Sequence, residues 1–331
     1  MTEHFLNLST EDMSKQKIVG SMLLKHPDVR HMHDAFEAMI LKLEKAESAA
    51  SLVEQLRPNI LLTGETGTGK ELVTQSLYRR LLDAEILPEK PKSGISYGAV
   101  NCACLESELL EIELFGTTEH AFTDAGNQPG LVAHLAGYKD IDPKRGLLGK
   151  PSDTPALLYL DEIGAADLRV QAKLLRLLDN REFTPRGLLG KGYLAHNLII
   201  VSATNELSPF SKGESTNDRF RGDLFHRLGD TFHFHLPPLR ERRDEIPEIA
   251  MQFYQKYYRL FVDPQVKSPS LPSGVAEILQ KASWPGNGRQ LHQVIRRSFI
   301  LWNGENESDY REIVKMELGR HRSDCDSSEF Q

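Results

Sequence analysis

The chain of 331 residues has few cysteines and no long apolar run. Its three cysteines, Cys102, Cys104 and Cys325, include one Cys-x-Cys pair without a second pair, which is the wrong spacing for a zinc site, so we expect reduced, partly buried thiols. No apolar run reaches the ~18 residues of a membrane span, and the first residues lack a basic segment followed by an apolar one. These absences predict a soluble, cytosolic protein with no membrane partner.

An excess of basic charge is also missing. Asp and Glu number 47 against 40 Lys and Arg, giving a net charge of −7, which argues against a chain that coats nucleic acid by charge alone. Histidines occur in two close pairs, His31 with His33 and His233 with His235. Neither pair has further ligands at a recognised spacing, so we interpret them as ordinary side chains rather than metal sites.

The stretch from Asn59 to Glu71 has the strongest functional signal. A short apolar run leads into a glycine-rich turn and then a helical pattern from Lys70 to about Leu82, which is the order of strand, phosphate loop and helix in a P-loop. Its glycines let the backbone adopt positive φ and approach an anion, and Lys70 adds a charge for the outer phosphates. The predicted nucleotide-binding residues are Gly64, Glu65, Thr66, Gly67, Thr68, Gly69, Lys70 and Glu71. Glu71 stands where a magnesium-binding Ser or Thr usually follows the lysine. The alternative is a glycine-rich turn that happens to precede a helix.

Two acids, Asp161 and Glu162, follow the apolar run Ala156 to Leu160. A buried strand of this kind delivers carboxylates to the carboxyl edge of a parallel sheet, where Asp161 would hold Mg2+ and Glu162 would polarise the attacking water. Acids after a strand can also simply cap the next helix, but the phosphate loop upstream favours the catalytic interpretation. Asn205 follows another apolar run and could touch the γ-phosphate or the water, although by itself it is no better a signal than a turn residue.

The order of the patterns predicts an α/β fold with a mainly parallel sheet flanked by helices, followed by a small all-helical domain. The predicted strands are Asn59 to Thr63, Tyr97 to Asn101, Ala156 to Leu160, Leu198 to Ala203 and Thr231 to His235. The predicted helices after Pro238 are Ile246 to Phe261, Ser273 to Ala282, Arg289 to Trp302 and Asp309 to Leu318. We expect a helical N-terminal segment over 1–57, an α/β domain over 58–240, a helical lid domain over 241–320 and a polar tail over 321–331. The tail is too short for a helix-turn-helix module, so no recognisable motif encodes a DNA contact.

Several motifs together resemble the AAA+ ATPases, and more closely the bacterial enhancer-binding proteins that activate sigma-54 RNA polymerase. The resemblance runs from about Ile18 to Ile300. It rests on the phosphate loop 64–71, Glu113-Leu114-Phe115-Gly116, Leu160-Asp161-Glu162-Ile163-Gly164, Phe220-Arg221-Gly222-Asp223-Leu224, Leu236-Pro237-Pro238-Leu239-Arg240-Glu241-Arg242 and Trp284-Pro285-Gly286-Asn287. The family's phosphate loops commonly carry glutamate at the position of Glu71.

The resemblance implies roles for residues that spacing alone would leave as solvated or turn residues. Asn101 would restrain the catalytic Glu162, and Asn205 would be the first sensor of the nucleotide. Arg221 and Arg227 would be arginine fingers that reach a neighbouring subunit's ATP, so catalysis would need a ring, hexameric or similar. Arg289 would be the second sensor, and Ile18, Val19 and Gly20 would lie beside adenine.

The segment that would contact the partner departs from the family pattern. Sigma-54 activators carry Gly-Ala-Phe-Thr-Gly-Ala at the tip of a mobile loop, whereas residues 120–125 read His-Ala-Phe-Thr-Asp-Ala. Phe122 and Thr123 are kept as the expected partner-binding residues. His120 and Asp124 replace the two glycines of the family motif. They restrict the backbone and change the surface offered to a partner.

Extra sequence from about Tyr138 to Thr154 is a second departure. Within it the segment 145–150, Arg-Gly-Leu-Leu-Gly-Lys, recurs letter for letter at 186–191. We hypothesise that both copies lie on loops near the 120–125 tip and serve the same partner. The alternative is a chance match between glycine-rich turns.

The leading hypothesis is an oligomeric ATPase that uses Mg-ATP to remodel a protein partner, with sigma-54 RNA polymerase as the favoured target. One alternative is a motor of the same family that acts on a different protein. Another is a nucleotide-binding scaffold that does not hydrolyse ATP, against which the presence of Lys70, Asp161, Glu162, Arg221 and Arg227 argues.

Overall fold

The computed structural model describes residues 25–91, 94–119, 121, 126–142, 146–188, 192–205, 220–266 and 269–326, with side chains through residue 320. The chain forms two compact units, one built on residues 31–64 and 70–235. The other contains Glu65–Gly69 and the chain from Leu236 onward, together with the described residues up to Arg30. None of the described helices has both the length and the apolar character of a bilayer span.

A five-stranded parallel sheet organises the first unit, in the order β11-β1-β10-β7-β2. The strands are β1 (Asn59–Thr63), β2 (Tyr97–Asn101), β7 (Ala156–Asp161), β10 (Leu198–Thr204) and β11 (Phe232–His235). The predicted fold class is therefore confirmed. Sequence-adjacent strands are not always neighbours, because β10 lies between β1 and β7.

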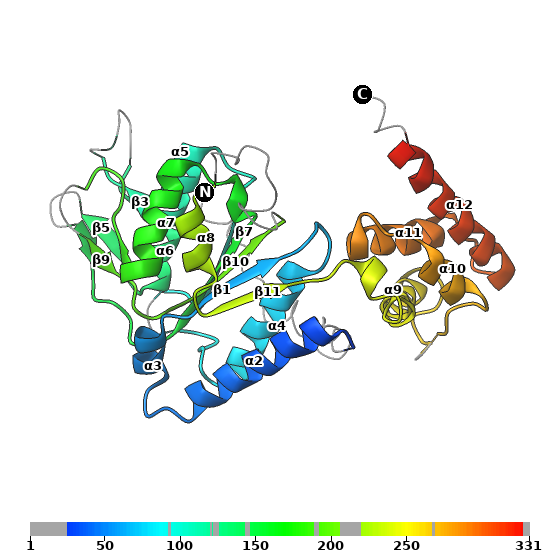
Figure 1. The fold of residues 1–331 in the computed structure, drawn as a ribbon, viewed down its shortest axis with the longest axis horizontal. Coiled ribbons are helices and arrows are strands. Elements are labelled where there is room, and N and C mark those ends of the chain that lie inside the picture. Colours follow the sequence, from blue (N-terminus) through cyan, green and yellow to red (C-terminus); the bar gives the residue numbers. More distant parts are fainter. Residues whose placement is uncertain are drawn as a thin grey trace. The chain divides into compact units, whose positions relative to one another are not determined.

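Helices cover both faces of the sheet, as Figure 1 shows for α6, α7 and α8 on one side and α2 and α4 on the other. These five helices are α2 (Pro27–Glu44), α4 (Lys70–Asp83), α6 (Leu131–Leu135), α7 (Leu168–Asn180) and α8 (Gly222–Leu228), and α5 (Ser107–Phe115) packs against α6. Because both faces are covered, β1 and β10 are buried along their whole length. The apolar runs in the sequence reflect this double burial.

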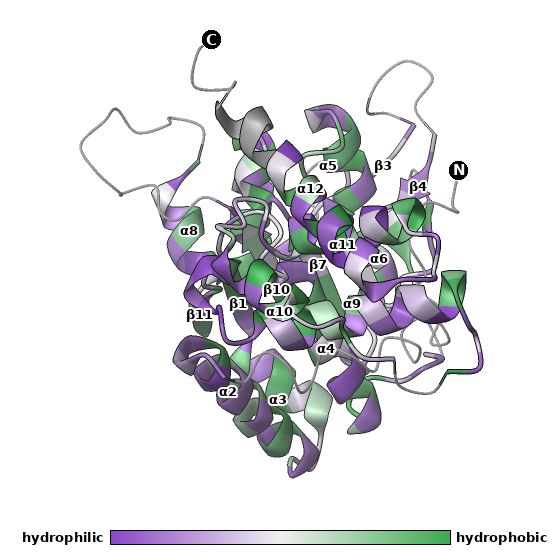
Figure 2. Ribbon diagram, turned by 90° about the vertical axis from the view of Figure 1, so that its right-hand side faces the viewer, coloured by the Kyte–Doolittle hydropathy of each residue, from purple (hydrophilic) through white to green (hydrophobic). Residues whose placement is uncertain are grey.

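The N-terminal helical pattern is interrupted in the structure. The sequence predicts a helical N-terminal segment over 1–57, and its described part contains two helices, because α2 ends at Glu44 and α3 begins at Ala49 and ends at Leu56. Ser48 is the N-cap of α3, since its side chain accepts a hydrogen bond from the Ser51 amide. Figure 2 shows hydrophilic and hydrophobic residues alternating along α2 and α3, as expected for helices with one buried face.

Three short antiparallel pairs extend from the first unit: β3 (Gly116–Thr117) with β4 (Gln128–Pro129), β5 (Asp140–Asp142) with β6 (Gly146–Leu148), and β8 (Glu182–Phe183) with β9 (Tyr193–Leu194). The extra segment 138–154 forms the β5–β6 hairpin. Tyr138 packs against Phe183 and Tyr193 with ring centroids 6.1 and 5.7 Å apart, so the aromatic rings hold this hairpin to β8–β9.

The region from Leu236 is helical, as predicted. It contains α9 (Ile246–Phe261), α10 (Val275–Lys281), α11 (Asn287–Leu301) and α12 (Glu307–Asp326), preceded by a short 3₁₀ turn at Leu239–Glu241. Its core is aromatic, with Tyr254, Trp284, Phe299 and Tyr310 buried together. Helix α12 continues to Asp326, so part of the predicted polar tail is helical.

Candidate nucleotide site

Four strands end at one edge of the sheet, and a residue that the sequence singled out lies at the end of each strand or directly after it. The register pairs Thr63 with Thr204 and Asn101 with Asp161. The phosphate loop therefore begins at the same edge where Asn101, Asp161 and Asn205 end their strands. Asn205 itself is exposed and follows the central strand β10.

The phosphate loop has the backbone that an anion site requires. Gly64, Gly67 and Gly69 adopt φ of 147°, 81° and 107°, and α4 begins at Lys70. Side chains other than glycine rarely adopt such angles, which explains the three glycines. Lys70 is 6% exposed and its ammonium donates to the Gly64 carbonyl at 2.7 Å.

Asp161 is held at both of its carboxylate oxygens. Asn101 Nδ2 donates to Oδ2 and the Tyr159 hydroxyl donates to Oδ1, both at 3.0 Å. Burial first, and then the charge of Asp161, raise the pKa of Tyr159, so its hydroxyl stays protonated and remains a donor. The carboxylate is thereby oriented while keeping lone pairs for another ligand.

Glu162 adopts a left-handed backbone with φ of 48° at the start of the 3₁₀ turn Ile163–Ala165. Such strain in a residue other than glycine costs of order 1–3 kcal/mol and is concentrated at functional sites. The conformation turns the chain sharply immediately after β7. A general base at that point is consistent with the predicted role of Glu162, which stays a prediction.

Asn101 is fixed in a tight turn rather than free at the strand end. Its Oδ1 accepts from the Ala103 amide at 2.9 Å, and the Cys102 amide donates to the Asp161 carbonyl at 2.9 Å. Burial, followed by the charges of Asp161 and Glu162, raises the pKa of the Cys102 thiol to about 12, so this free thiol is inert. Asn101 contacts Asp161, and its implied restraint on Glu162 stays a prediction.

The two predicted arginine fingers lie at the N-cap of α8 (Arg221) and in its last turn (Arg227), and both make ion pairs within the chain. Arg221 binds Asp223 at 3.0 and 2.7 Å, and this pairing lowers the pKa of Asp223 to about 2. Arg227 binds Asp179 at 2.8 Å and lines a surface cavity together with Asn59. Both guanidinium groups are on exposed side chains.

Several predicted site residues lie outside the described part of the chain. These are the adenine-side residues Ile18, Val19 and Gly20 and the partner-binding residues Phe122 and Thr123, along with His120 and Asp124. The base of the 120–125 loop is described. Thr118 N donates to the carbonyl of Arg186 at 3.0 Å, so the second Arg-Gly-Leu-Leu-Gly-Lys copy begins beside that loop.

The first copy lies next to the second. A Cβ placed on Gly146 would overlap the Tyr193 hydroxyl and would lie 3.6 Å from Leu188 Cδ2. The first glycine of each copy has a similar backbone, with φ of 81° at Gly146 and 87° at Gly187. The described parts of the two copies are therefore neighbours. Gly146–Leu148 of the first copy form strand β6, so this copy does not lie on a loop as expected, and the service of the two copies to a partner stays a hypothesis.

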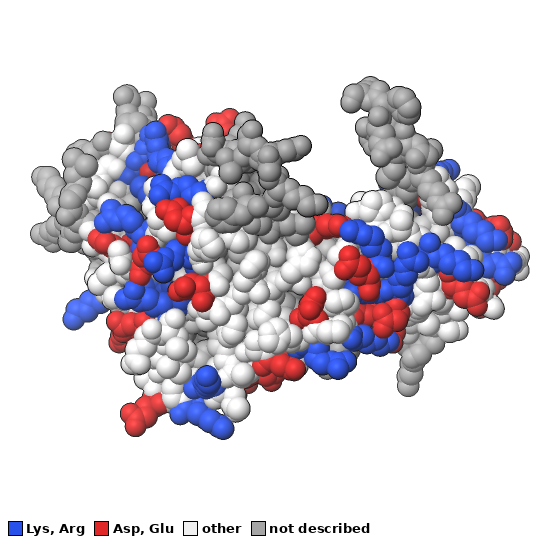
Figure 3. Space-filling view, viewed as in Figure 1, with Lys and Arg blue, Asp and Glu red and all other residues white. Residues whose placement is uncertain are grey.

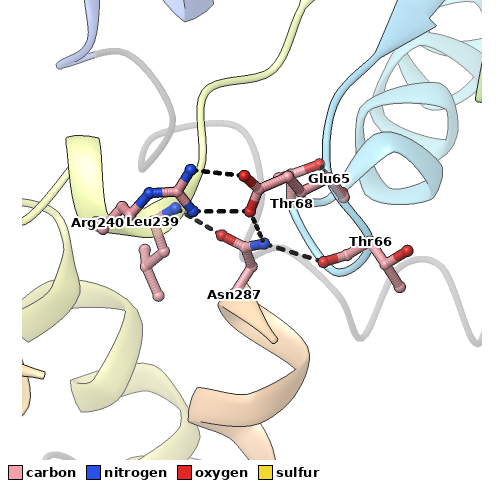
Figure 4. Close-up of polar contacts among 6 residues, drawn as sticks. All are labelled: Glu65, Thr66, Thr68, Leu239, Arg240 and Asn287. Atoms are coloured by element: carbon pink, nitrogen blue, oxygen red, sulfur yellow. Dashed lines mark hydrogen bonds and ion pairs between the residues drawn. The ribbon is translucent and has the colours of Figure 1, made fainter. Parts of the chain in front are cut away.

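Sequence reasoning missed a polar cluster around Glu65. Figure 4 shows the Glu65 carboxylate bound by Arg240, at 2.6 and 2.8 Å, and by the Asn287 amide at 3.1 Å. Arg289, the predicted second sensor, is exposed and lies two residues beyond Asn287 on α11. The motifs that contain Arg240 and Asn287 were visible in the sequence, but nothing in their spacing pairs them with Glu65.

A parallel sheet with β10 between β1 and β7, a phosphate loop after β1 and an acid pair after β7 define a P-loop domain of the AAA+ class. Residues 37–138 and 141–233 match the Sigma-54 interaction domain, and residues 240–317 match the AAA+ ATPase lid domain. The chain therefore belongs to the AAA+ family of sigma-54-dependent transcriptional activators, which confirms the resemblance drawn from its motifs.

Relatives of known name are similar over most of this chain. The DNA-binding transcriptional activator HyfR of Escherichia coli K12 is 32% identical over 280 residues, covering 84% of this chain and 35% of HyfR. The regulatory protein AtoC of the same strain is 32% identical over 297 residues, covering 84% of this chain and 54% of AtoC. The chain thus spans about a third to a half of the length of these relatives.

A solved structure shares the fold. The structure of NtrX from Brucella abortus in complex with ATP has a TM-score of 0.59 and 25% identity, covering 86% of this chain and 51% of that chain.

Proposed function

We propose that this chain is an ATP-hydrolysing motor that assembles into a ring and remodels a protein partner, with sigma-54 RNA polymerase as the favoured partner. The observation that carries the proposal is the meeting, at one sheet edge, of the phosphate loop with Asn101, Asp161 and Asn205. The family membership and the ATP complex of the related NtrX support ATP as the nucleotide.

The residues at the edge fit Mg-ATP. Positive φ at Gly64, Gly67 and Gly69 and the N-terminus of α4 suit the phosphates, and Lys70 adds positive charge. Asp161 would hold Mg2+ through its oxygens, in keeping with the ion's preference for one or two carboxylates plus phosphates and water. When bound, the ion would neutralise negative charge on the phosphates.

Glu162 is the group proposed to act on water. Its carboxylate would accept a hydrogen bond from the water whose oxygen attacks the γ-phosphorus, while the bond from phosphorus to the ADP oxygen breaks. Asn205, exposed at the end of β10, would orient the same water or the γ-phosphate. Asn101 would act through Asp161, to which it donates.

We infer that Arg227 serves a different copy of the chain. It lines a cavity with Asn59, at the start of β1, whereas the phosphate loop follows Thr63 at the far end of that strand. A strand of this length spans about 13 Å, so Arg227 lies at the sheet edge opposite its own loop. A finger in that position supports a nucleotide cleft completed by a neighbouring subunit.

Turnover as a function of protein concentration tests the motor. Phosphate release per chain should rise steeply with concentration, because only the assembled ring has complete sites. A protein that binds ATP but releases no phosphate at any concentration would be the non-hydrolysing scaffold instead.

A second candidate is the same motor acting on another protein. It is favoured by the replacement of both loop glycines by His120 and Asp124 and by the added β5–β6 hairpin, which lies against β8–β9 next to the base of the loop. Capture of sigma-54 in the presence of a transition-state analogue of ATP separates the two candidates. Capture that is lost in Thr123→Ala selects sigma-54, and no capture by the wild type selects another partner.

The described residues on the face drawn in Figure 3 carry charges of both signs. Lys and Arg are interspersed there with Asp and Glu, in keeping with the net charge of −7. A continuous basic patch would be the usual sign of phosphate-backbone contact.

A further inference from the structure

A phosphate loop has an outer side whose hydrogen bonds must also be satisfied. Its amides point toward the anion, so its carbonyl oxygens point away and need donors of their own. Here five consecutive carbonyls each accept at least one hydrogen bond. Gly64 O accepts from Lys70 Nζ, Glu65 O from Thr68 N and Oγ1, Thr66 O from Asn287 Nδ2, Gly67 O from Gly288 N, and Thr68 O from Arg242 Nη2.

Three of these donors come from the helical region after Leu236. Asn287 donates to Thr66 O at 3.0 Å, Gly288 N to Gly67 O at 3.0 Å, and Arg242 to Thr68 O at 3.3 Å. This agrees with the grouping of Glu65–Gly69 with that region as one compact unit. The tip of the phosphate loop is therefore held by the lid.

Asn287 is the centre of this arrangement. Its amide nitrogen donates to Thr66 O and to the Glu65 carboxylate, and its oxygen accepts from Leu239 N at 2.7 Å (Figure 4). Both hydrogens and the oxygen of the side chain are thus used, and the residue is completely buried. No aliphatic side chain could replace these three contacts.

The backbone around Asn287 is strained in a way that serves these contacts. Trp284 and Asn287 adopt φ of 54° and 50°, and the Asn287 amide donates to the Trp284 carbonyl. Residues other than glycine adopt this region at a cost that surrounding contacts must offset. The approach is also close, since a Cβ on Gly67 would lie 2.5 Å from the Gly286 carbonyl.

Glu65 supplies a second link between the loop and the lid. Arg240 binds both of its carboxylate oxygens, a geometry in which the guanidinium fixes direction as well as charge. The pair is partly exposed, so it contributes little energy by itself. Its value lies in holding the carboxylate where Asn287 can donate to it.

We propose that Asn287 and Glu65 are positioning residues, which hold the phosphate loop in its anion-accepting form by fixing the outward carbonyls to the lid. The inference rests on the proposed nucleotide site. Because coupling between two equilibria is reciprocal, a nucleotide bound in the loop must in turn stabilise the loop's contacts with the lid. The lid would therefore sense occupancy through the loop backbone, independently of any contact made by Arg289.

The first test is the affinity of the full-length chain for ADP, measured by calorimetry. Asn287→Gly keeps the positive φ without strain but removes all three side-chain contacts. Asn287→Asp keeps the acceptor for Leu239 but cannot donate to Thr66 and places a carboxylate beside Glu65. We expect each to raise the Kd by about tenfold or more, the equivalent of about 1.4 kcal/mol. The matched control is Gln293→Glu, an amide-to-acid change at an exposed position of the same helix, which should leave the Kd unchanged.

A milder variant keeps the inference testable if the buried substitutions unfold the lid. Glu65 is partly exposed, and Glu65→Gln should raise the Kd about threefold through loss of the Arg240 ion pair. In steady-state assays KM for ATP should rise more than kcat falls, because the variants weaken a loop geometry that binds substrate and transition state alike.

Hydrogen exchange provides a readout that a purely structural role would not change. ADP should slow exchange of the Gly288 amide, the donor to Gly67 O, in the wild type and to a smaller extent in Asn287→Gly. Two results would overturn this inference alone, provided that the wild type binds ADP. The first is an ADP affinity of the variants equal to that of the wild type, and the second is a Gly288 amide whose exchange rate does not change when ADP binds. A wild type that binds no nucleotide overturns the proposed function as well.

Discussion

At the residue scale, the proposed chemistry depends on a few side chains, one of them on a strained backbone. Glu162 follows a buried strand and adopts φ of 48°, and its neighbour Asp161 is oriented by Asn101 and Tyr159. These features follow from one sequence pattern, an apolar run that ends in two acids. The strain at Glu162 was not visible in that pattern, because glutamate has no preference for the left-handed region.

Glu162→Gln should bind ATP with unchanged affinity but lose turnover by a factor of about 100 or more, since an amide cannot accept a proton from the attacking water. Nucleotide binding and phosphate release, measured on the same sample, would show that the variant keeps its affinity for ATP and loses turnover. The matched control is Glu85→Gln, because Glu85 is exposed and has a similar φ of 54°. Wild-type turnover in Glu162→Gln would remove Glu162 from the mechanism.

The contacts of Glu65 mark the limit of sequence reasoning at this scale. Arg240 and Asn287 lie 175 and 222 residues away along the chain, and no periodicity relates them to the phosphate loop. Local patterns predict which residues end a strand. They do not predict which distant side chain will satisfy a loop carbonyl.

At the element scale, the sheet was predictable and the short hairpins were not. Each strand lies within one residue of its predicted range. The signal is a continuous apolar run for β1, β7 and β10, because these strands are buried along almost their whole length. The hairpin strands β5, β6, β8 and β9 have only two or three residues each, too few to show a period. Their positions depend on aromatic packing among Tyr138, Phe183 and Tyr193.

The β5–β6 hairpin should be sensitive to any side chain at Gly146. Gly146→Ala should destabilise the fold by about 2–4 kcal/mol, because the Cβ would overlap the Tyr193 hydroxyl and the backbone has positive φ. Gly149→Ala is the control, since its φ is also positive but its Cβ would find the nearest atom at 3.8 Å. Urea midpoints that are equal for the two variants would refute the packing at Gly146.

The lid should lose stability in mild acid through His292. Burial first, and then Lys256 and Arg296, lower the pKa of this ring, which shares a 2.6 Å hydrogen bond with the Tyr257 hydroxyl. As the pH falls, His292 takes up a proton in the unfolded chain before it does so in the folded protein. The stabilisation that depends on neutral His292 is therefore present above about pH 6.5 and is lost as the pH falls toward the lower pKa of His292 in the folded protein.

His292→Gln should therefore lose less stability than the wild type between pH 7.5 and 5.5. Because the ring is only half-buried, the difference should stay below about 1 kcal/mol. Thermal unfolding across this pH range would measure it, and parallel curves for the two proteins would show that His292 is not responsible.

At the scale of the whole molecule, the sequence predicted an α/β unit followed by a helical one, and the structure contains both. It did not predict that the tip of the phosphate loop would group with the lid. That grouping arises from hydrogen bonds to loop carbonyls, which are backbone groups common to every sequence. A motif gives the identity of a loop, whereas its partners depend on the complete fold.

The central claim is that ATP binds in a cleft shared by adjacent copies, held by the loop of one and triggered by Arg227 of the next. Mixing two inactive variants tests it most directly. Lys70→Ala lacks a working loop but keeps Arg227, and Arg227→Ala has the reverse defect.

In an equal mixture, about a quarter of the sites should combine an intact loop with a neighbour's Arg227, so phosphate release should recover to about a quarter of the wild-type rate. Recovery at that level is the result that the account predicts. A mixture no more active than the two variants measured separately would contradict it.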